Sequence, residues 1–171
     1  MSVLDVIRNR GSIRNYKDEQ INKGDLSKIL ESARLSQSAA NRQPWQFVVV
    51  NEKSMKKKLS RAANNQQFVG KAATVIVCLA DPSVSARVGQ FDGFLIDLAI
   101  SIENMVLTAW DLGIGSCWIG AFWEDEVKEL LGIPSNLRVI SLLALGYPDQ
   151  EPRSKSRKDL NEIVYFEKYR K

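Results

Sequence analysis

Two groups of basic side chains, one near each end of the chain, could bind an anionic ligand. Arg10 and Arg14 stand four residues apart around a Gly-Ser pair. Lys155 and Arg157 belong to a basic segment, residues 153–158, that follows no helical or strand periodicity. The guanidinium fork donates two parallel charge-assisted hydrogen bonds, which suits a phosphate group. The two groups therefore predict a phosphorylated ligand, although solvated surface charge is the plainer interpretation of each group taken alone.

Two other segments suit the flat part of such a ligand. Residues 38–43, Ser-Ala-Ala-Asn-Arg-Gln, form a small polar stretch whose Asn and Gln amides both donate and accept hydrogen bonds. Residues 113–120 contain three glycines, which predicts a turn where the backbone can approach a ring closely. Together the four segments indicate a molecule that carries a phosphate and a flat ring with polar edges.

The composition excludes several classes of chemistry. The chain contains no histidine, which rules out Ser-His and Cys-His nucleophilic sites and His-containing zinc sites. Its two cysteines, Cys78 and Cys117, lie in apolar stretches and predict reduced core thiols of a cytoplasmic protein, with no metal site. Gly113-Ile114-Gly115 lacks the third glycine of a dinucleotide fingerprint and follows a helix instead of a strand. An enzyme of this composition must rely on a bound cofactor or on carboxylate and lysine chemistry.

The element that must position these segments is a long apolar helix within residues 92–122. Its first two-thirds are hydrophobic on nearly every face, which requires burial in protein or in lipid. Asp97, Glu103 and Asn104 interrupt it, and charges are costly at the centre of a bilayer. We therefore expect a central helix buried in the fold and against a second subunit.

The remaining chain alternates helices and strands. The spacing predicts helices that begin near Ser2, with Asp5 completing a cap, and near Asn22 or Asp25. Further helices are expected over residues 52–63, with its lysines outward, and 123–131. Apolar runs predict strands at residues 47–50, 74–80 and 139–145, and residues 163–166 suggest an edge strand. With 171 residues, the chain is expected to form one layered α/β or α+β domain.

These segments, in this order, resemble the nitroreductase family of flavin mononucleotide (FMN) oxidoreductases. The resemblance rests on Arg10-x-Ser12-x-Arg14, Ser38–Phe47, the helix of Asp97–Trp110, Gly113–Gly120, Leu145–Pro148 and Pro152–Arg157. It implies an α+β fold over residues 1–171: a three-layer α/β/α sandwich with a mostly antiparallel mixed sheet and a long central helix. It also implies a homodimer with two FMN sites at the subunit interface, each built from both chains.

The resemblance assigns roles to particular residues. Arg10, Gly11 and Ser12 match the segment that holds the FMN phosphate and ribityl chain, and Lys155 and Arg157 match further phosphate contacts. Arg14 matches a cation beside the flavin ring that stabilises the negative charge of the reduced flavin. The other matching positions are a partner-chain loop (Ser38, Ala39, Asn41 and Gln43), the pyrimidine edge (Gln66) and the backbone along the ring (Ile119 and Gly120).

The implied activity is electron transfer in two half-reactions at one site. NAD(P)H would reduce the flavin, and a nitroaromatic, quinone or similar small acceptor would then take the electrons, so that no catalytic side chain acts as an acid or base. No nucleic acid or membrane partner is expected. Gln37 replaces a proline common in the family, and little sequence separates Gly70 from Asp92, where longer relatives place a lid.

Two alternatives remain open. The chain could be a flavin-binding relative with another role, such as a dehydrogenase-type or flavin-consuming enzyme or a non-catalytic flavin sensor. It could also be a basic nucleic-acid-binding module that uses residues 153–158, in which case its binding would weaken steeply with salt.

Overall fold

The computed structural model describes residues 2–153 and 156–169. Its helices are α1 (Val3–Asn9), α2 (Lys23–Arg34), α3 (Lys53–Ala62), α4 (Gln67–Lys71), α5 (Gly93–Asp111) and α6 (Glu124–Leu131), with 3-10 turns at Ala39–Asn41 and Leu160–Glu162. Its strands are β1 (Trp45–Val50), β2 (Thr74–Ala80), β3 (Arg87–Val88), β4 (Phe91–Asp92), β5 (Gly115–Ile119) and β6 (Arg138–Gly146).

Four strands form the central sheet in the order β1-β2-β6-β5, and every neighbouring pair is antiparallel. The N-terminal segment adds a parallel bridge between Ser12 and Ser116 at the outer edge of β5. The short strands β3 and β4 form a separate hairpin that leads into α5. The expected α+β fold with a mostly antiparallel sheet is confirmed.

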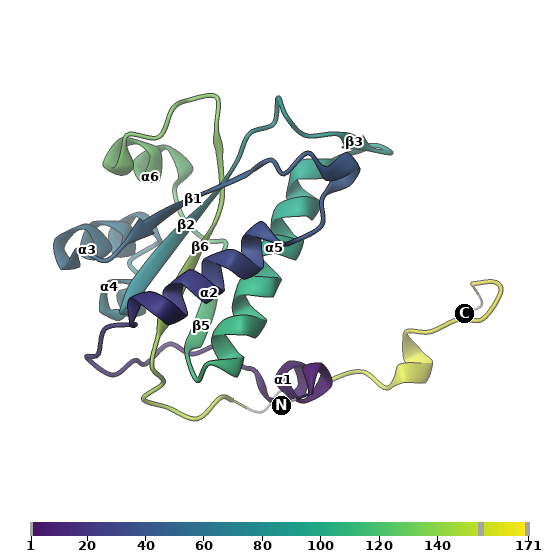
Figure 1. The fold of residues 1–171 in the computed structure, drawn as a ribbon, viewed down its shortest axis with the longest axis horizontal. Coiled ribbons are helices and arrows are strands. Elements are labelled where there is room, and N and C mark those ends of the chain that lie inside the picture. Colours follow the sequence, from purple (N-terminus) through teal and green to yellow (C-terminus); the bar gives the residue numbers. More distant parts are fainter. Residues whose placement is uncertain (1, 154–155, 170–171) are drawn as a thin grey trace.

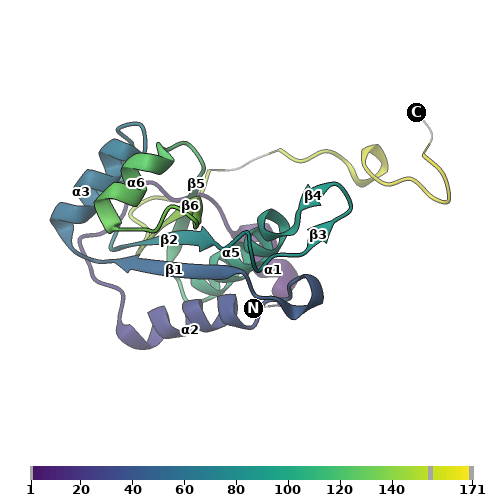
Figure 2. The same cartoon turned by 90° about the horizontal axis from the view of Figure 1, so that it is seen from above.

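Helices cover both faces of the sheet. Figure 2 shows α3 and α6 on one side of β1 and β2, with α2 on the other. The alternation of β2 explains the two layers, because successive side chains of a strand point to opposite faces. Val75 and Val77 pack with α3, α4 and α6, whereas Ile76 and Cys78 pack with α2 and α5. All seven residues of β2 are buried, as its continuous apolar run predicts.

Helix α5 is the longest helix and crosses the second layer from the β3–β4 hairpin to α1 (Figure 1). Leu98, Ile102 and Met105 on its inner face are completely buried, which confirms the expected central helix. Among the described helices, α5 alone is long and apolar enough to cross a membrane, and half of that stretch is buried within this single chain, as in a core helix. Leu95 and Ile96, by contrast, are exposed.

Helix α1 has the predicted start but a different environment. The Ser2 hydroxyl accepts a hydrogen bond from the Asp5 backbone N–H, and the Asp5 carboxylate accepts from the Ser2 backbone N–H, which completes a capping box. Val6 is buried, but Val3, Leu4 and Ile7 are exposed. The apolar face of α1 is therefore only partly covered by its own chain.

The expectation that every lysine of α3 points outward is wrong for Lys56. Its side chain is buried, and its ammonium donates hydrogen bonds to the carbonyl oxygens of Ala72 (2.6 Å) and Ala73 (2.8 Å). The aliphatic stem of a lysine can cross an apolar layer while its head remains solvated by carbonyl groups. Lys56 thus ties α3 to the chain between α4 and β2, and burial is the main cause that lowers its pKa.

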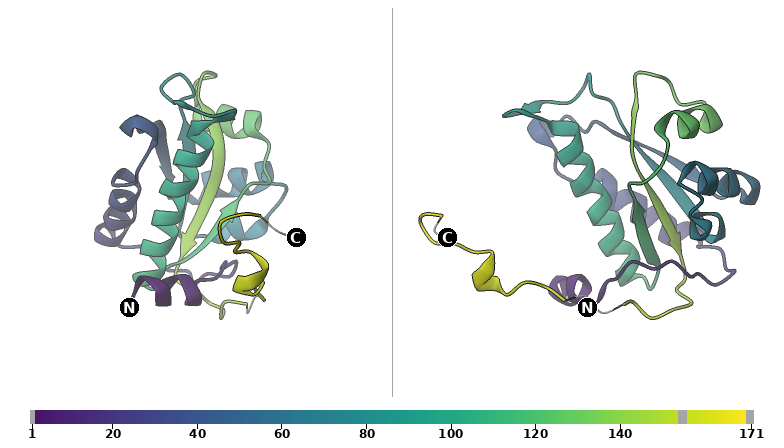
Figure 3. Two further views of the ribbon diagram at one scale, coloured as in Figure 1. Left: turned by 90° about the vertical axis from the view of Figure 1, so that its right-hand side faces the viewer. Right: turned by 180° about the vertical axis from the view of Figure 1, so that it is seen from behind.

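Two other sequence-based expectations need correction. Residues 115–119 are not part of a glycine turn: they form strand β5, and the turn is limited to Gly113, whose φ is +74°. Residues 163–166 form no edge strand. They belong instead to an extended arm, residues 156–169, that projects from the body (Figures 1 and 3) and exposes Ile163 and Phe166. A strand there would need a neighbouring edge for hydrogen bonding, and the arm lies away from the sheet.

Candidate functional site

Four arginines from both ends of the described chain surround one hollow of about 460 Å³, which we call the arginine hollow. Its lining comprises Ile7, Arg8, Asn9, Arg10, Pro152, Arg153 and Arg157. The structure therefore brings together Arg10 and Arg157, two predicted phosphate ligands that are 147 positions apart in the sequence numbering. Several guanidinium groups around one hollow form a strong site for an anion. Lys155, the third predicted phosphate ligand, lies outside the described residues.

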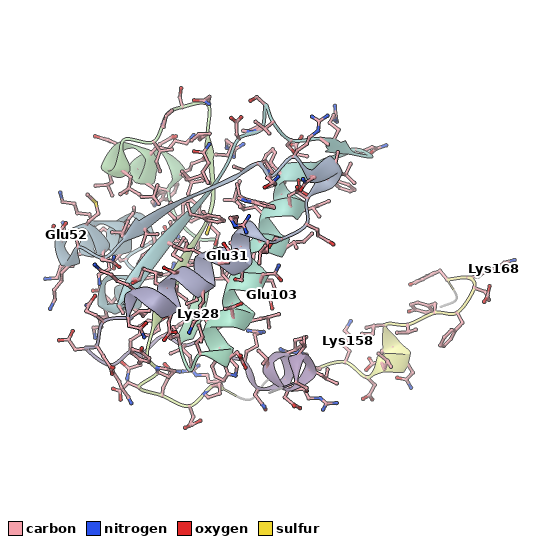
Figure 4. All side chains as sticks on the ribbon, viewed as in Figure 1. Lys28, Glu31, Glu52, Glu103, Lys158 and Lys168 are labelled. Atoms are coloured by element: carbon pink, nitrogen blue, oxygen red, sulfur yellow. The ribbon has the colours of Figure 1, made fainter. Side chains whose placement is uncertain are left out.

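The backbone around the arginine hollow depends on Gly11. A Cβ atom at this position would lie 2.5 Å from Cβ of Pro152, so only glycine lets the C-terminal segment pack this closely against the N-terminal one. Nearby, Glu103 of α5, labelled in Figure 4, approaches Arg10 with 3.9 Å between Oε1 and Nε. This loose ion pair steadies Arg10 and leaves most of its donors available to a ligand.

From the arginine hollow the N-terminal segment runs along the outer edge of β5. The backbone N–H of Ile13 donates to the carbonyl oxygen of Ser116 (2.9 Å), so Ser116 directs its backbone groups away from β6. Strand alternation places the backbone groups of Trp118 on the same outer edge, and Gly120 follows directly after the strand. No heavy atom lies within 4 Å of the place where a Gly120 Cβ would stand. This edge is open to a flat ligand.

Ile119 and Gly120 are the two residues at this edge that were predicted to contact the ring. The side chain of Ile119 is not available to a ligand. Ile119 is buried in the core between the sheet and α3, α4 and α6, and its carbonyl oxygen accepts from the Ser141 hydroxyl (3.1 Å). Ile119 can therefore serve the site only by placing Gly120.

Arg14 and Gln66 lie at the far end of the same edge. The Arg14 guanidinium carbon is 5.7 Å from the ring centroid of Phe68 on α4, within the range of a cation–π interaction. The Arg14 backbone N–H donates to the Gln150 side chain (3.2 Å). Gln66 donates its amide to the carbonyl oxygens of Ala63 (2.9 Å) and Ala121 (3.1 Å), so its NH₂ group holds the chain beside Gly120.

The loop of residues 38–43 is held in an unusual conformation. Ala40, Asn41 and Gln43 have φ angles of 51°, 54° and 50°, in the left-handed region that costs a non-glycine residue about 1–2 kcal/mol. The Ser38 hydroxyl accepts a hydrogen bond from the Gln43 N–H (2.9 Å), and the Gln43 amide donates to the Asn41 carbonyl oxygen (3.2 Å). Strain that the surroundings maintain is common in ligand-binding segments.

Asp97 of α5 anchors this loop. Its buried Oδ1 accepts a hydrogen bond from the Ala39 backbone N–H (2.9 Å). Its Oδ2 is also buried and has no hydrogen-bond partner among the described residues. A buried carboxylate oxygen without a donor is costly, so a hydrogen-bond donor from outside the described residues would stabilise Oδ2.

The 38–43 loop and the segment that carries Arg10 approach different parts of α5: Ala39 is held by Asp97, and Arg10 lies near Glu103. Figure 1 shows α1, which borders the arginine hollow, beside the C-terminal end of α5, whereas the 38–43 loop follows α2 to the end of α5 near β3. At 1.5 Å per residue, Asp97 and Glu103 are separated by roughly 9 Å along the helix axis. Among the described residues, no hydrogen bond or ion pair joins Ser38, Ala39, Asn41 or Gln43 to Arg10 or Gly120.

Sequence reasoning missed several residues of this arrangement. Arg8 lines the arginine hollow but looks like an ordinary charge in the last turn of α1. Phe68 contacts Arg14, and Asp97 holds the 38–43 loop. A buried acidic residue in an apolar helix was a usable signal for Asp97, since unpaired carboxylates are rarely buried.

Comparison with known proteins gives concordant findings. The profile described as Nitroreductase family matches residues 7–81 and 57–147. An Archaeoglobus fulgidus protein, whose name combines NADH dehydrogenase and NAD(P)H nitroreductase, is 43% identical over 152 residues, which are 86% of each chain.

Solved structures agree. An FMN-dependent nitroreductase of Clostridium difficile has 30% identity and a TM-score of 0.86, with 97% of this chain and 99% of that chain covered. An NADPH:FMN oxidoreductase of Vibrio harveyi, solved in complex with NAD+, has 27% identity and a TM-score of 0.90, with 99% of this chain and 78% of that chain covered. With its antiparallel sheet, long central helix and matching sequence, the chain belongs to the nitroreductase family.

Proposed function

We propose that this protein is an FMN-dependent NAD(P)H oxidoreductase. The observation that carries the proposal is the continuous edge from the arginine hollow, along residues 10–14, to the open backbone at Gly120. This edge offers several cations at one end, and at the other the open backbone of Gly120 together with Arg14. A flavin mononucleotide has the matching order of groups: a phosphate, a polyol chain and a flat ring.

Each part of the edge has a separate task in this proposal. Arg10 and Arg157 bind the phosphate through charge-assisted hydrogen bonds, with Lys155 as a further phosphate ligand. Gly11 and Ser12 shape the segment beside the polyol chain. Gly120 leaves room for the ring and offers its backbone N–H.

Arg14 is the electrostatic part of the site. When bound, FMN supplies the redox chemistry by accepting a hydride from NAD(P)H and passing electrons on. Arg14, held by the Phe68 ring and by Gln150, keeps a fixed positive charge near the ring and stabilises negative charge that develops there. Gln66 maintains the backbone beside the ring through Ala121.

We further propose that residues 1–171 act as a single domain and that the site is completed by a second copy of the chain. The loop of Ser38, Ala39, Asn41 and Gln43 would then reach the flavin bound to the partner. Two features support this: the loop makes no hydrogen bond to Arg10 or Gly120 within the described part of its own chain, and α1, α5 and the arm expose large apolar side chains. A dimer would bury these surfaces and supply a donor to Asp97.

The acceptor is proposed to be a small oxidised molecule, such as a nitroaromatic compound or a quinone, that binds after the oxidised nicotinamide leaves. Such a ping-pong order predicts parallel lines in double-reciprocal plots of rate against donor at several acceptor concentrations. Intersecting lines would contradict it. Flavin reduction by NAD(P)H without turnover of any such acceptor would favour a flavin-binding relative with another role.

The first experiment is a visible spectrum of the purified protein with added FMN. We expect a yellow protein that elutes as a dimer in size-exclusion chromatography with light scattering. Anaerobic NADH or NADPH should bleach it. A protein that refuses FMN would overturn the proposed function.

A further inference from the structure

We propose that a second basic hollow, between α3 and α4, binds the phosphate groups of the nicotinamide dinucleotide donor. This proposal rests on the proposed function, because it assigns a place to the donor of that reaction. The α3–α4 hollow has a volume of about 300 Å³ and is lined by Lys57, Ser60, Arg61, Asn65, Gln67, Gly70 and Lys71. The lining contains three cations, one hydroxyl and two amides, and no carboxylate.

The three cations lack partners. Within residues 2–153 and 156–169, no ion pair or side-chain hydrogen bond engages the charged groups of Lys57, Arg61 or Lys71. Elsewhere on the surface, Lys28 pairs with Asp25, and Arg34 pairs with Glu31. Three like charges around one hollow repel one another, and an anion between them would relieve that repulsion.

The wall of the hollow is held rigid. Asn64 and Asn65 form the turn between α3 and α4 with φ angles of 53° and 57°. The Gln67 amide donates to the Asn65 carbonyl oxygen (3.3 Å), and the buried Ser60 hydroxyl donates to that of Gln66 (2.9 Å). A turn fixed in this way presents its polar groups in one arrangement, which lowers the entropic cost of binding.

A neighbouring hollow of about 310 Å³ shares Lys57, Gly70 and Lys71 with the first and adds Lys17, Lys53 and Lys56. Lys56 secures this junction through its hydrogen bonds to Ala72 and Ala73. Asp18 and Glu19 line the part that is not shared. The lining of the α3–α4 hollow itself therefore contains three cations and no carboxylate.

The hollow adjoins the proposed flavin edge through α4. This one-turn helix carries Phe68, which contacts Arg14, beside Gln67 and Lys71, which line the hollow. An α-helix with its side chains is only about 10–12 Å wide. Gln66, one residue before α4, contacts Ala121 at the same edge. A donor with its nicotinamide on the ring could thus extend its phosphorylated end over α4.

Lysine suits this task. The ammonium group is a mobile point charge on a flexible stem, whereas the guanidinium fork binds bidentately. A donor that must bind and leave in every turnover benefits from electrostatic attraction that steers it without holding it tightly.

The test compares two triple variants of the FMN-loaded protein that each remove three positive charges. One is Lys57→Ala/Arg61→Ala/Lys71→Ala, in the hollow. The control is Lys23→Ala/Lys28→Ala/Lys58→Ala, with two lysines on α2 and one on α3 that does not line the hollow. The first probe is 2′,5′-ADP, which carries the adenosine phosphates of NADPH without its nicotinamide. Isothermal titration calorimetry measures its binding.

We expect the hollow variant to weaken 2′,5′-ADP binding at least tenfold and the control variant to change it less than twofold. In stopped-flow reduction, the apparent Kd for NADPH should rise similarly, while the FMN affinity and the KM for the acceptor remain unchanged. Wild-type donor binding should also weaken with added NaCl, and this salt dependence should be flatter in the hollow variant.

Three results would overturn the proposal: no measurable binding of 2′,5′-ADP to wild type, equal weakening in both triple variants, or an unchanged NADPH Kd in the hollow variant. Inorganic phosphate binding as tightly as 2′,5′-ADP would identify a general anion site instead. Failure of the proposed function is a separate outcome, seen as an FMN-loaded protein that NADPH does not bleach although 2′,5′-ADP binds in the hollow.

Discussion

The arginine hollow and the α3–α4 hollow are both basic, but they differ in construction. The first is lined by four arginines brought together from residues 8–10 and 153–157, with the Glu103 carboxylate 3.9 Å from Arg10. The second is made by one helix–turn–helix segment, residues 57–71, and its lining holds no carboxylate. One depends on long-range packing and the other on local structure.

This difference separates two kinds of anion binding. Converging guanidinium groups, partly steadied by a carboxylate, suit a phosphate that stays bound. Unpaired, flexible cations suit a ligand that exchanges. In the proposed dimer the first site also receives the partner's 38–43 loop, whereas the lining of the second comes from a single chain. Changes in dimerisation or in the 38–43 loop should therefore affect only the first site.

The largest expected effect is that of Arg10→Ala. Loss of charge-assisted hydrogen bonds in the arginine hollow should weaken FMN binding by about 100-fold, measured by quenching of FMN fluorescence. Arg10→Lys keeps the positive charge but lacks the guanidinium fork, so its FMN affinity should lie between those of wild type and Arg10→Ala. Lys28→Ala, on the surface of α2 (Figure 4), is the matched control. An Arg10→Ala protein that binds FMN like wild type would remove the distinction between the two hollows.

A smaller effect is expected for Asp97→Ala, which leaves the Ala39 N–H without its acceptor. The left-handed residues of the loop can then relax, and we expect turnover with a quinone to fall by about tenfold. Asp97→Asn keeps an acceptor for Ala39 and should retain most of the activity. Binding of 2′,5′-ADP should be unaffected in both variants, and a parallel loss there would show that the two sites are not independent.

The paired cations around Glu124 provide a reference for charges that serve the fold. Glu124 accepts hydrogen bonds from Arg138 Nε (3.0 Å) and the Val139 N–H (3.0 Å) and pairs with Lys128 (3.1 Å). Burial would raise the pKa of Glu124, but these donors outweigh it and lower the pKa from 4.5 to about 2. Because its pKa is lower in the folded state than in the unfolded state, the Glu124 carboxylate stabilises the fold at any pH above its ordinary pKa. This stabilisation is lost as the pH falls from the ordinary pKa to the pKa of the folded state.

The free energy of unfolding should therefore decrease as the pH is lowered from 4.5 to about 2. In the Glu124→Gln variant this loss of stability should be smaller. At pH 7 this variant should lower the Tm by about 3 °C, measured by circular dichroism. Removing the unpaired Lys57, by contrast, should leave the Tm unchanged or raise it. A drop in Tm for Lys57→Ala equal to that for Glu124→Gln would contradict a ligand-binding role of the unpaired charges.

The smallest expected effect belongs to Phe68→Leu, between the two hollows. Loss of the cation–π contact loosens Arg14 and weakens its stabilisation of the reduced flavin. A contact of about 0.5–1 kcal/mol corresponds to a potential more negative by roughly 10–20 mV for a two-electron couple. Photoreduction against a reference dye measures this shift, and Phe68→Tyr, which keeps the ring, should remain at the wild-type potential.

Much of the fold could be predicted because it follows from local patterns. The apolar run of residues 74–80, the cap at Ser2 and the pattern of residues 123–131 all predicted elements that the structure contains, and the last of these ends at Gly132, whose φ is +64°. The two β2 faces follow from strand alternation. The family could be predicted from ordered motifs, because several motifs in one order and spacing are more specific than any one of them.

Other features depended on which segments meet. Lys56 looked like a surface lysine, and only the position of α3 over Ala72 and Ala73 gives its ammonium two carbonyl acceptors. Residues 163–166 have strand-like composition, but the arm has no adjacent edge with which to pair. A pattern of residue types carries no information about whether such a partner is within reach.

By itself, the sequence determined the residue types available to the site: arginines for a phosphate, glycines for a flat ring and no histidine for acid–base work. Only the tertiary structure decided that Arg8 and Arg153 join Arg10, that Asp97 holds the 38–43 loop, and that the Lys56 ammonium reaches the carbonyl oxygens of Ala72 and Ala73. Local spacing fixes helices and strands through short-range hydrogen bonds. The neighbours of a charge, by contrast, depend on contacts between residues far apart in the chain.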